Sequence, residues 1–259
     1  TYACTVTDTA KIEKPDAPTW AVLSPDKKWE AFSHNYNIYI RKAGLLEHKR
    51  VPPDTSAAGR DAGAGGRGAG AGRGGAAADS LTLPDSSIQL TTDGINEYAY
   101  GTETRSTLPT DRPTRARPQL IWSPDSKKIA VIRIDERNVR RYPLYSSTRS
   151  QPRYVLYPYA ATGDSILVRY DTHVLDIDAR SNVHVADEKP PTIVHGMSGL
   201  AALKWSKKSD KLYLLDALRG AKRVTMLVAD LKTGKTTPIT RDSAATFVEV
   251  SIIIESRYG

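Results

Sequence analysis

Short apolar stretches alternate with polar residues along the chain, and three of them share one pattern around a polar turn. The copies span residues 22–32, 121–131 and 204–214. In the first two, Ser opens the turn, Pro sets φ at about −65°, and Asp accepts backbone N–H bonds. Apolar and polar residues alternate on either side, as in strands. Each copy predicts strand, tight turn and strand, and the third, with Lys207 in place of proline, is expected to be looser.

A second unit predicts longer hairpins, because residues 226–240 resemble residues 174–185. Gly234 and Asn182 stand where a hairpin turn is expected to need positive φ. The serines that open the three turns are 99 and 83 residues apart, about two blades each at roughly 40 to 50 residues per blade. The sequence therefore predicts an all-β partial β-propeller over residues 1–259, with about four to five antiparallel four-stranded blades, incomplete at the C-terminus.

A Gly/Ala/Arg-rich segment interrupts this pattern, and residues 57–78 hold 9 of the 18 glycines. Such a segment has little apolar surface to bury and much backbone entropy to lose. We expect residues 55–83 to be a disordered insertion within the propeller.

Composition narrows the classes of partner. The 13 Tyr residues, against 2 Phe and 2 Met, suit half-exposed strands. The net charge of +8 comes from Lys and Arg interspersed with Asp and Glu, which indicates a solvated basic surface and argues against nucleic-acid binding. No apolar run reaches the roughly 18 residues of a membrane span. Cys4 is the single cysteine, so neither an intrachain disulfide nor a cysteine metal site is expected.

Three motifs resemble nucleotide-binding or nucleophile signatures, but each is incomplete or lies in an unsuitable context. Residues 63–68 satisfy G-x-G-x-x-G only within the repetitive segment, and Gly234-Lys235-Thr236 lacks the first glycine of a P-loop. Residues 196–200 resemble a nucleophile elbow but end in Leu200. The five histidines show no metal-ligand spacing, and we expect neither a metal nor a cofactor. The histidines are His34, His48, His173, His184 and His195.

The order of several phrases resembles the N-terminal propeller of the dipeptidyl peptidase IV family of prolyl oligopeptidase-type serine peptidases. The phrases are Ser-Pro-Asp-Lys-Lys-Trp at 24–29, Asn-Ile-Tyr-Ile-Arg at 37–41, Leu-Thr-Thr-Asp-Gly at 90–94, Tyr-Ala-Tyr-Gly at 98–101, and residues 120–137 with Trp-Ser-Pro-Asp and Arg-Ile-Asp-Glu-Arg. The resemblance implies that an α/β-hydrolase domain carries the Ser, Asp and His of the catalytic triad. No catalytic residue is therefore expected in this chain, whose role would be to gate access of a peptide substrate.

The resemblance also implies a binding site for the amino terminus of the peptide. In the family, a pair of glutamates after a Tyr binds the ammonium group, which positions cleavage two residues in. Here Tyr100 is followed by Gly101, Thr102 and Glu103. Thr102 replaces the first glutamate, so Glu103 is the candidate amine contact. Glu97 is a weaker candidate, because the alignment around this loop could slip.

Two other functions compete with the peptidase hypothesis. A stand-alone propeller could present loops to a protein partner as an interaction scaffold, and residues 59–75 could bind RNA through Gly and Arg, although no aromatic residue is interleaved there. A partial propeller exposes sheet edges and an apolar flank. We therefore expect either self-association, such as a homodimer, or further sequence. The resemblance implies a periplasmic or secreted protein.

Overall fold

A computed structural model of the chain describes residues 20–44, 83–84, 86–102, 112–146, 153–186, 202–217, 220 and 222–248. In this part of the chain all regular elements are strands, in four antiparallel sheets. Sheet 1 contains β1 (Val22–Leu23), β2 (Trp29–His34), β3 (Asn37–Lys42), β4 (Ile88–Gln89) and β6 (Arg115–Ala116). Sheet 2 contains β5 (Tyr98–Tyr100), β7 (Leu120–Trp122), β8 (Lys128–Asp135), β11 (Arg169–Asp176) and β12 (Ser181–Val185).

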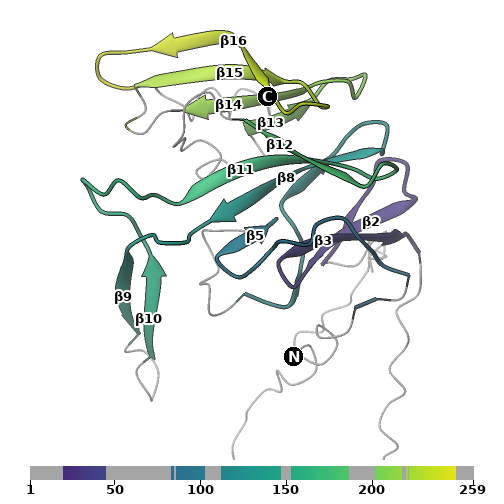
Figure 1. The fold of residues 1–259 in the computed structure, drawn as a ribbon, viewed down its shortest axis with the longest axis horizontal. Helices are drawn as coiled ribbons and strands as arrows, with labels where there is room; N and C mark the ends of the chain where they lie inside the picture. The colour runs from purple at the N-terminus through teal and green to yellow at the C-terminus, as the bar shows by residue number, and fades with distance from the viewer. Residues whose placement is uncertain are drawn as a thin grey trace, which may run out of the picture.

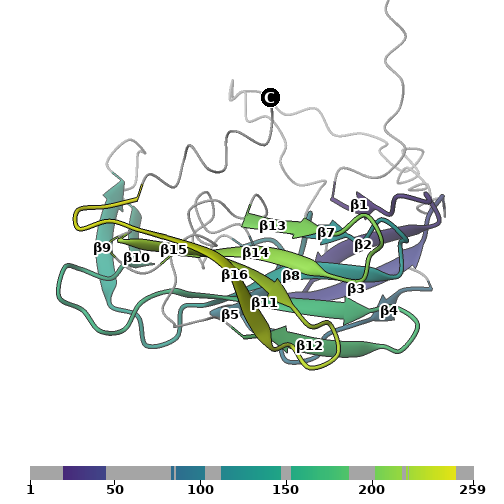
Figure 2. The same cartoon turned by 90° about the horizontal axis from the view of Figure 1, so that it is seen from above.

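The other two sheets complete the described fold. Sheet 3 contains β13 (Leu203–Trp205), β14 (Leu212–Ala217), β15 (Arg223–Ala229) and β16 (Thr236–Ser243). The fourth is the hairpin of β9 (Arg141–Ser146) and β10 (Arg153–Pro158). Sheets 1, 2 and 3 stack in order, with β1, β7 and β13 along one side of the stack (Figure 1 and Figure 2). The all-β, propeller-like fold is therefore confirmed.

The three repeated turns have one backbone geometry. In the first, Ser24 N donates to Trp29 O at 2.8 Å and Lys27 N donates to Ser24 O at 2.9 Å. The second turn repeats both distances, and the third has the same two bonds at 3.0 and 3.1 Å. The fourth residue of each turn has a φ of 59 to 61°. The third turn thus keeps the same bond pattern without a proline, and both of its bonds are 0.2 Å longer, in the direction that was predicted.

The same turns bond neighbouring sheets together. Two backbone amides donate to a serine Oγ of the next turn at 3.0 Å, from Asp26 to Ser126 and from Asp125 to Ser209. Two indole Nε1 atoms donate back to the preceding sheet at 3.2 Å, from Trp122 to Val22 O and from Trp205 to Ile121 O. Consecutive copies therefore lie in adjacent sheets, which corrects the two-blade spacing. Much of the intervening chain forms β9 and β10 or lies outside the described residues.

Apolar side chains fill the space between adjacent sheets. The core between sheets 1 and 2 includes Ile40, Trp122 and Leu175. The core between sheets 2 and 3 includes Val174 and Trp205. Alternate residues of β11 thus face opposite neighbours, as the two-residue period of a strand requires. Sheet 2 therefore packs against an apolar core on both faces.

The predicted outer hairpins are confirmed as β11–β12 and β15–β16. Gly234 has the expected positive φ of 70°. In the other hairpin, the positive φ of 51° belongs to Arg180, whereas Asn182 lies in β12 opposite Leu175. The expectation for Asn182 was wrong, because the turn closes two residues earlier. Gly234-Lys235-Thr236 belongs to the β15–β16 hairpin, as the structural reading of that motif predicts.

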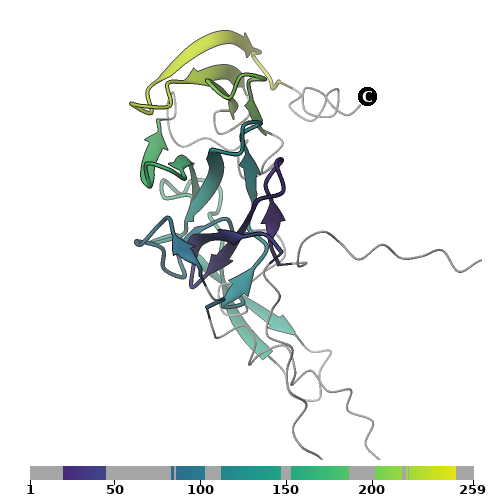
Figure 3. The same cartoon turned by 90° about the vertical axis from the view of Figure 1, so that its right-hand side faces the viewer.

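The β9–β10 hairpin projects away from the three stacked sheets (Figure 1 and Figure 3). Its exposed apolar side chains are Tyr142, Leu144, Tyr145, Tyr154 and Leu156. Within the described ranges, no helix is long and apolar enough to cross a membrane. The motifs at 63–68 and 196–200, and residues 55–82 of the expected insertion, lie outside the described residues.

Candidate functional site

The segment that follows β5 passes from the edge of sheet 2 to the edge of sheet 1. Strand β8 pairs with β11 along one edge, and with β7 and β5 along the other. Strand β2 likewise pairs with β3 along one edge, and with β1 and β6 along the other. The connection from β5 to β6, residues 101–114, thus leaves sheet 2 and arrives at sheet 1, each on the side of the first strand, and we call it the excursion; its residues 103–111 lie outside the described residues. The candidate Glu103 belongs to this excursion.

Gly101 fixes the point where the excursion leaves β5. Its φ is 66°, its N donates to Ile132 O at 2.8 Å, and its O accepts from Gln119 N at 2.8 Å. A Cβ at this position would lie 2.6 Å from Pro118 Cβ. Glycine is therefore required for both the positive φ and the close approach. The backbone at Thr102 consequently starts from a defined position.

The Tyr100 hydroxyl is the centre of a polar cluster behind this exit. It donates to Asp93 Oδ1 at 2.9 Å, and it accepts from Arg133 Nη1 at 2.9 Å and from Asn182 Nδ2 at 3.1 Å. One donated and two accepted bonds satisfy a phenol completely. Burial raises the pKa of Tyr100 to about 12, so the neutral hydroxyl persists across the physiological range.

Arg133 ties this cluster to two other strands and to the segment before β5. Its Nη1 contacts Asp93 Oδ2 at 2.9 Å, and its Nη2 lies 3.5 Å from Asp171 Oδ2 on β11. Its guanidinium lies 3.8 Å from the centre of the Tyr98 ring, within the range of a cation–π interaction. Because its partners come from β5, from β11 and from the segment before β5, Arg133 holds the exit of β5 against the rest of sheet 2.

His173 completes the cluster in an uncharged form. Its Nδ1 lies 2.7 Å from Asn182 Oδ1, and its ring packs edge-on against Tyr100 with centroids 5.2 Å apart. Burial, assisted by the charge of Arg133, lowers the pKa of His173 to about 4. The cross-strand His184 and the carboxylate of Asp171 also face it.

We predict that the chain loses stability between pH 7 and pH 5 because His173 must be neutral to fold. Its folded pKa of about 4 lies below the ordinary 6.5, so unfolding takes up a proton in this range. The stabilisation is complete above pH 6.5 and falls by about 2 kcal/mol at pH 5. Urea unfolding of the wild type and His173→Gln at both pH values measures this difference. An equal pH dependence in both proteins would contradict the assignment.

The returning end of the excursion is held by a buried ion pair. Arg112 Nη2 lies 2.8 Å from Glu136 Oε2, with side chains 3% and 6% exposed, and Arg112 Nη1 donates to Asn96 O. Burial raises the pKa of Glu136, which the charge of Arg112 opposes. One guanidinium therefore joins the end of the excursion to the segments before β5 and after β8.

The two candidate amine contacts have different positions. Glu103 lies outside the described residues, directly after Thr102. Glu97 lies before β5, with its side chain 39% exposed and its Oε1 2.5 Å from Arg141 Nη2. Its carboxylate therefore already has a cationic partner. The structure brings Glu97 near the base of the excursion, because Glu136 N donates to Glu97 O at 2.8 Å.

Sequence analysis missed the residues that support the excursion. Arg112 stands in a stretch without strand periodicity, and its partner is 24 positions away. His173 and His184 face each other across a hairpin. Their proximity can be recognised only when the strand register is known. Within the described ranges no group of three His, Cys, Asp or Glu could hold a metal ion. His34, His173 and His184 lie in strands, and His48 and His195 lie outside the described residues.

Comparison with known proteins finds one matching family and similar solved structures. The family model for the dipeptidyl peptidase IV N-terminal region matches residues 83–256. The fold is similar to dipeptidyl peptidase 4 of Porphyromonas gingivalis, with a TM-score of 0.59, 18% identity and coverage of 90% of this chain and 27% of that chain. It is also similar to a Bacteroides ovatus protein assigned as a dipeptidyl aminopeptidase IV, with a TM-score of 0.54, 13% identity and coverage of 91% and 25%.

The chain spans about a quarter of the length of these two structures. No curated protein sequence matches it. The family match covers more than half of the chain and includes the excursion, both of its supports, and sheets 2 and 3. The chain therefore belongs to the dipeptidyl peptidase IV family and corresponds to part of its N-terminal propeller region.

Proposed function

We propose that this chain is a non-catalytic propeller portion of a dipeptidyl peptidase IV-like serine peptidase. In this role it gates access of a peptide substrate and helps bind its amino terminus. The observation that carries the proposal is the excursion after Tyr100, which is fixed at Gly101 and again at Arg112. The resemblance supports the proposal, because it aligns the residues after Tyr100 with the family's glutamate pair. The partner would be an α/β-hydrolase domain of the same polypeptide, which supplies the catalytic triad.

The proposed amine contact is a single carboxylate. Glu103 would form a charge-assisted hydrogen bond with the terminal ammonium group. Thr102 stands where the family has its first glutamate, so the site has one negative charge in place of two. A threonine hydroxyl can still accept a hydrogen bond but adds no Coulomb attraction. We therefore expect weak selectivity for a free amino terminus, with Glu97 contributing little because Arg141 neutralises it.

Restoring the second glutamate should strengthen amine recognition. We expect Thr102→Glu to increase the preference for a free over an acetylated amino terminus about tenfold, because a second charge-assisted bond adds about 1.5 kcal/mol. Glu103→Gln should remove the preference. Calorimetric titration of the chain with Ala-Pro-Ala-Ala and its N-acetylated form measures both effects.

Glu97→Gln is the matched control for the loss of one negative charge, and it should leave the preference unchanged. Equal binding of free and acetylated peptide by the wild type and by Thr102→Glu would contradict the proposal. If Glu97→Gln alone removed the preference, the contact would belong to Glu97.

A propeller scaffold for a protein partner is the second candidate function. The exposed apolar hairpin favours it, since Tyr145 is 75% and Tyr154 is 54% exposed and such surface often marks an interaction site. This function predicts no preference for a free amino terminus in any of the four proteins. The same titrations therefore separate the two candidates.

A further inference from the structure

Strand β5 leads directly into the excursion, yet it is a short edge strand of three residues that pairs with β8. At its first residue, Tyr98, the backbone N donates to Ile95 O at 2.9 Å and the backbone O accepts from Ile95 N at 3.1 Å. Both groups thus bond within the preceding turn. The side chain of Tyr98 therefore supplies the contacts with β8 that its N–H and C=O do not make.

Two arginines hold the ring of Tyr98 between them. The guanidinium carbons of Arg133 and Arg137 each lie 3.8 Å from the centre of this ring, well inside the roughly 6 Å range of a cation–π interaction. Two guanidinium groups this close to one ring centre would overlap on a single face, so they occupy opposite faces. We call these three residues the clamp. It joins the start of β5 to β8 and to the residues just after β8.

Carboxylates fix both arginines of the clamp. Arg137 bonds to Asp135 twice, from Nε to Oδ1 at 2.9 Å and from Nη2 to Oδ2 at 2.8 Å. Arg133 contacts Asp93 at 2.9 Å and Asp171 at 3.5 Å. A bidentate pair sets the plane of a guanidinium as well as its position. The clamp is therefore arranged in advance, even though Arg137 is 46% exposed.

The clamp lies three residues before Gly101, where the excursion leaves β5. Because β5 is so short, a shift of its first residue would move Gly101 and Thr102 with it. We propose that Tyr98 and Arg137 are positioning residues, which act through β5 to hold the exit of the excursion in the place that amine recognition requires. The role in recognition rests on the proposed function, whereas the hold on Gly101 does not.

Amide hydrogen exchange of the full chain tests the hold on Gly101, whose N–H donates to Ile132 O at 2.8 Å. Tyr98→Leu and Arg137→Met should each raise the exchange rate of this amide at least fivefold, because each removes a part of the clamp. Tyr98→Phe should keep the wild-type rate, since a phenyl ring still fits between two guanidinium groups. Unchanged exchange at Gly101 in Arg137→Met or in Tyr98→Leu would overturn the proposal.

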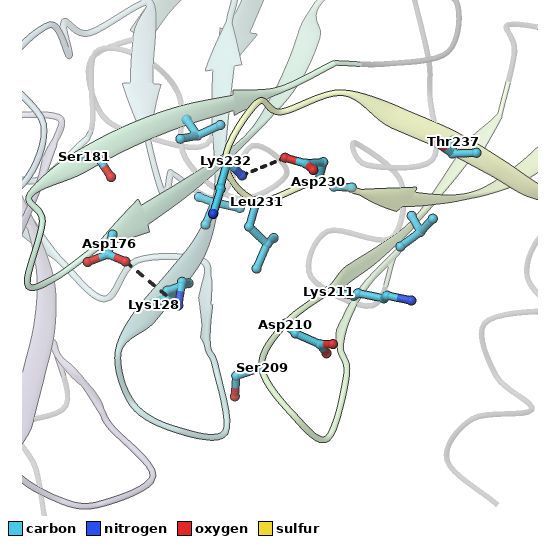
Figure 4. Close-up of a pocket in the computed structure, with 14 residues that line it drawn as sticks. Lys128, Asp176, Ser181, Ser209, Asp210, Lys211, Asp230, Leu231, Lys232 and Thr237 are labelled. Carbon is cyan, nitrogen blue, oxygen red and sulfur yellow. Dashed lines mark hydrogen bonds and ion pairs between the residues drawn. The ribbon is translucent and has the colours of Figure 1, made fainter.

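A matched control lies at the opposite end of β8. Figure 4 shows Lys128 facing Asp176, with Nζ 3.9 Å from Oδ2. Lys128→Met removes one positive charge and one ion pair from the first residue of β8, whereas Tyr98 pairs with the last, Asp135, about 23 Å further along the strand. It should leave the exchange of Gly101 unchanged. Equal effects of Lys128→Met and Arg137→Met at Gly101 would indicate a general loss of stability and would overturn the proposal.

Peptide titration in the Thr102→Glu background tests the role in amine recognition, because the preference for free over acetylated Ala-Pro-Ala-Ala is expected to be largest there. Arg137→Met should lower this preference at least threefold, and Tyr98→Phe should preserve it. Loss of a positive charge alone would instead strengthen binding of an ammonium group, so the direction of the change separates positioning from electrostatics. An unchanged or increased preference in Arg137→Met would overturn the positioning role. If Thr102→Glu itself showed no preference, the proposed function would fail, and exchange at Gly101 would still decide whether the clamp holds the exit.

Discussion

Replacing Arg112 by alanine is expected to lower the free energy of unfolding by about 3 to 5 kcal/mol, because it leaves a buried carboxylate without its partner. Glu136 is 6% exposed and lies 2.8 Å from the guanidinium, and burial already raises its pKa. The variant also removes the donor to Asn96 O. Urea unfolding at pH 7, followed by tryptophan fluorescence, measures the loss.

Two further variants separate the buried pair from other effects. Arg112→Met combined with Glu136→Leu should recover most of the stability, since an apolar pair needs no charge compensation. Arg140→Ala removes an arginine that is 59% exposed and pairs with Asp164, and it should cost less than about 1 kcal/mol. If Arg112→Ala cost no more than Arg140→Ala, the buried pair would not support the excursion.

Gly234→Ala is expected to destabilise the junction between sheets 2 and 3 by about 2 to 4 kcal/mol, as the sum of backbone strain and steric overlap. The residue has a φ of 70°, and a Cβ would lie 1.9 Å from His184 O. The neighbouring bond from Ala186 N to Gly234 O would be displaced as well. Thermal and urea unfolding report the change.

Gly44→Ala isolates the backbone contribution. Gly44 has a similar φ of 75°, but a Cβ there would meet nothing within 4 Å. The control should cost about 1 kcal/mol from positive φ alone. Equal destabilisation by the two substitutions would mean that the contact with His184 O relaxes freely and does not hold the junction.

The repeated strand and turn units could be predicted because their determinants are local. Ser24, Asp26 and the flanking apolar residues specify the turn and its strands within about ten positions. The third turn shows that proline is not essential, since with Lys207 in its place the same two bonds form at slightly longer distances. The spacing of 83 residues between the second and third copies was misleading because β9 and β10 lie between them.

The candidate site was less predictable because its supports are distant in sequence. The resemblance identifies Thr102 and Glu103 as candidate residues. It does not predict that the two ends of the excursion are held in place. This support depends on Arg112 and Glu136, and on Arg133 reaching Asp93 40 positions away. Such pairs become visible only when the strand register is known. Likewise, the neutral state of His173 follows from burial, which its sequence neighbours do not reveal.

The bonds between consecutive sheets give the stack a direction. A sheet joins its predecessor through two groups, a tryptophan Nε1 and a serine Oγ, supplied by Trp122 and Ser126 in sheet 2. Sheet 1 has Leu23 and Lys27 at these positions, so it can receive a following sheet but cannot join a preceding one in this way. Stability should then accumulate junction by junction, as in repeat proteins, with each following sheet bonded to the one before it.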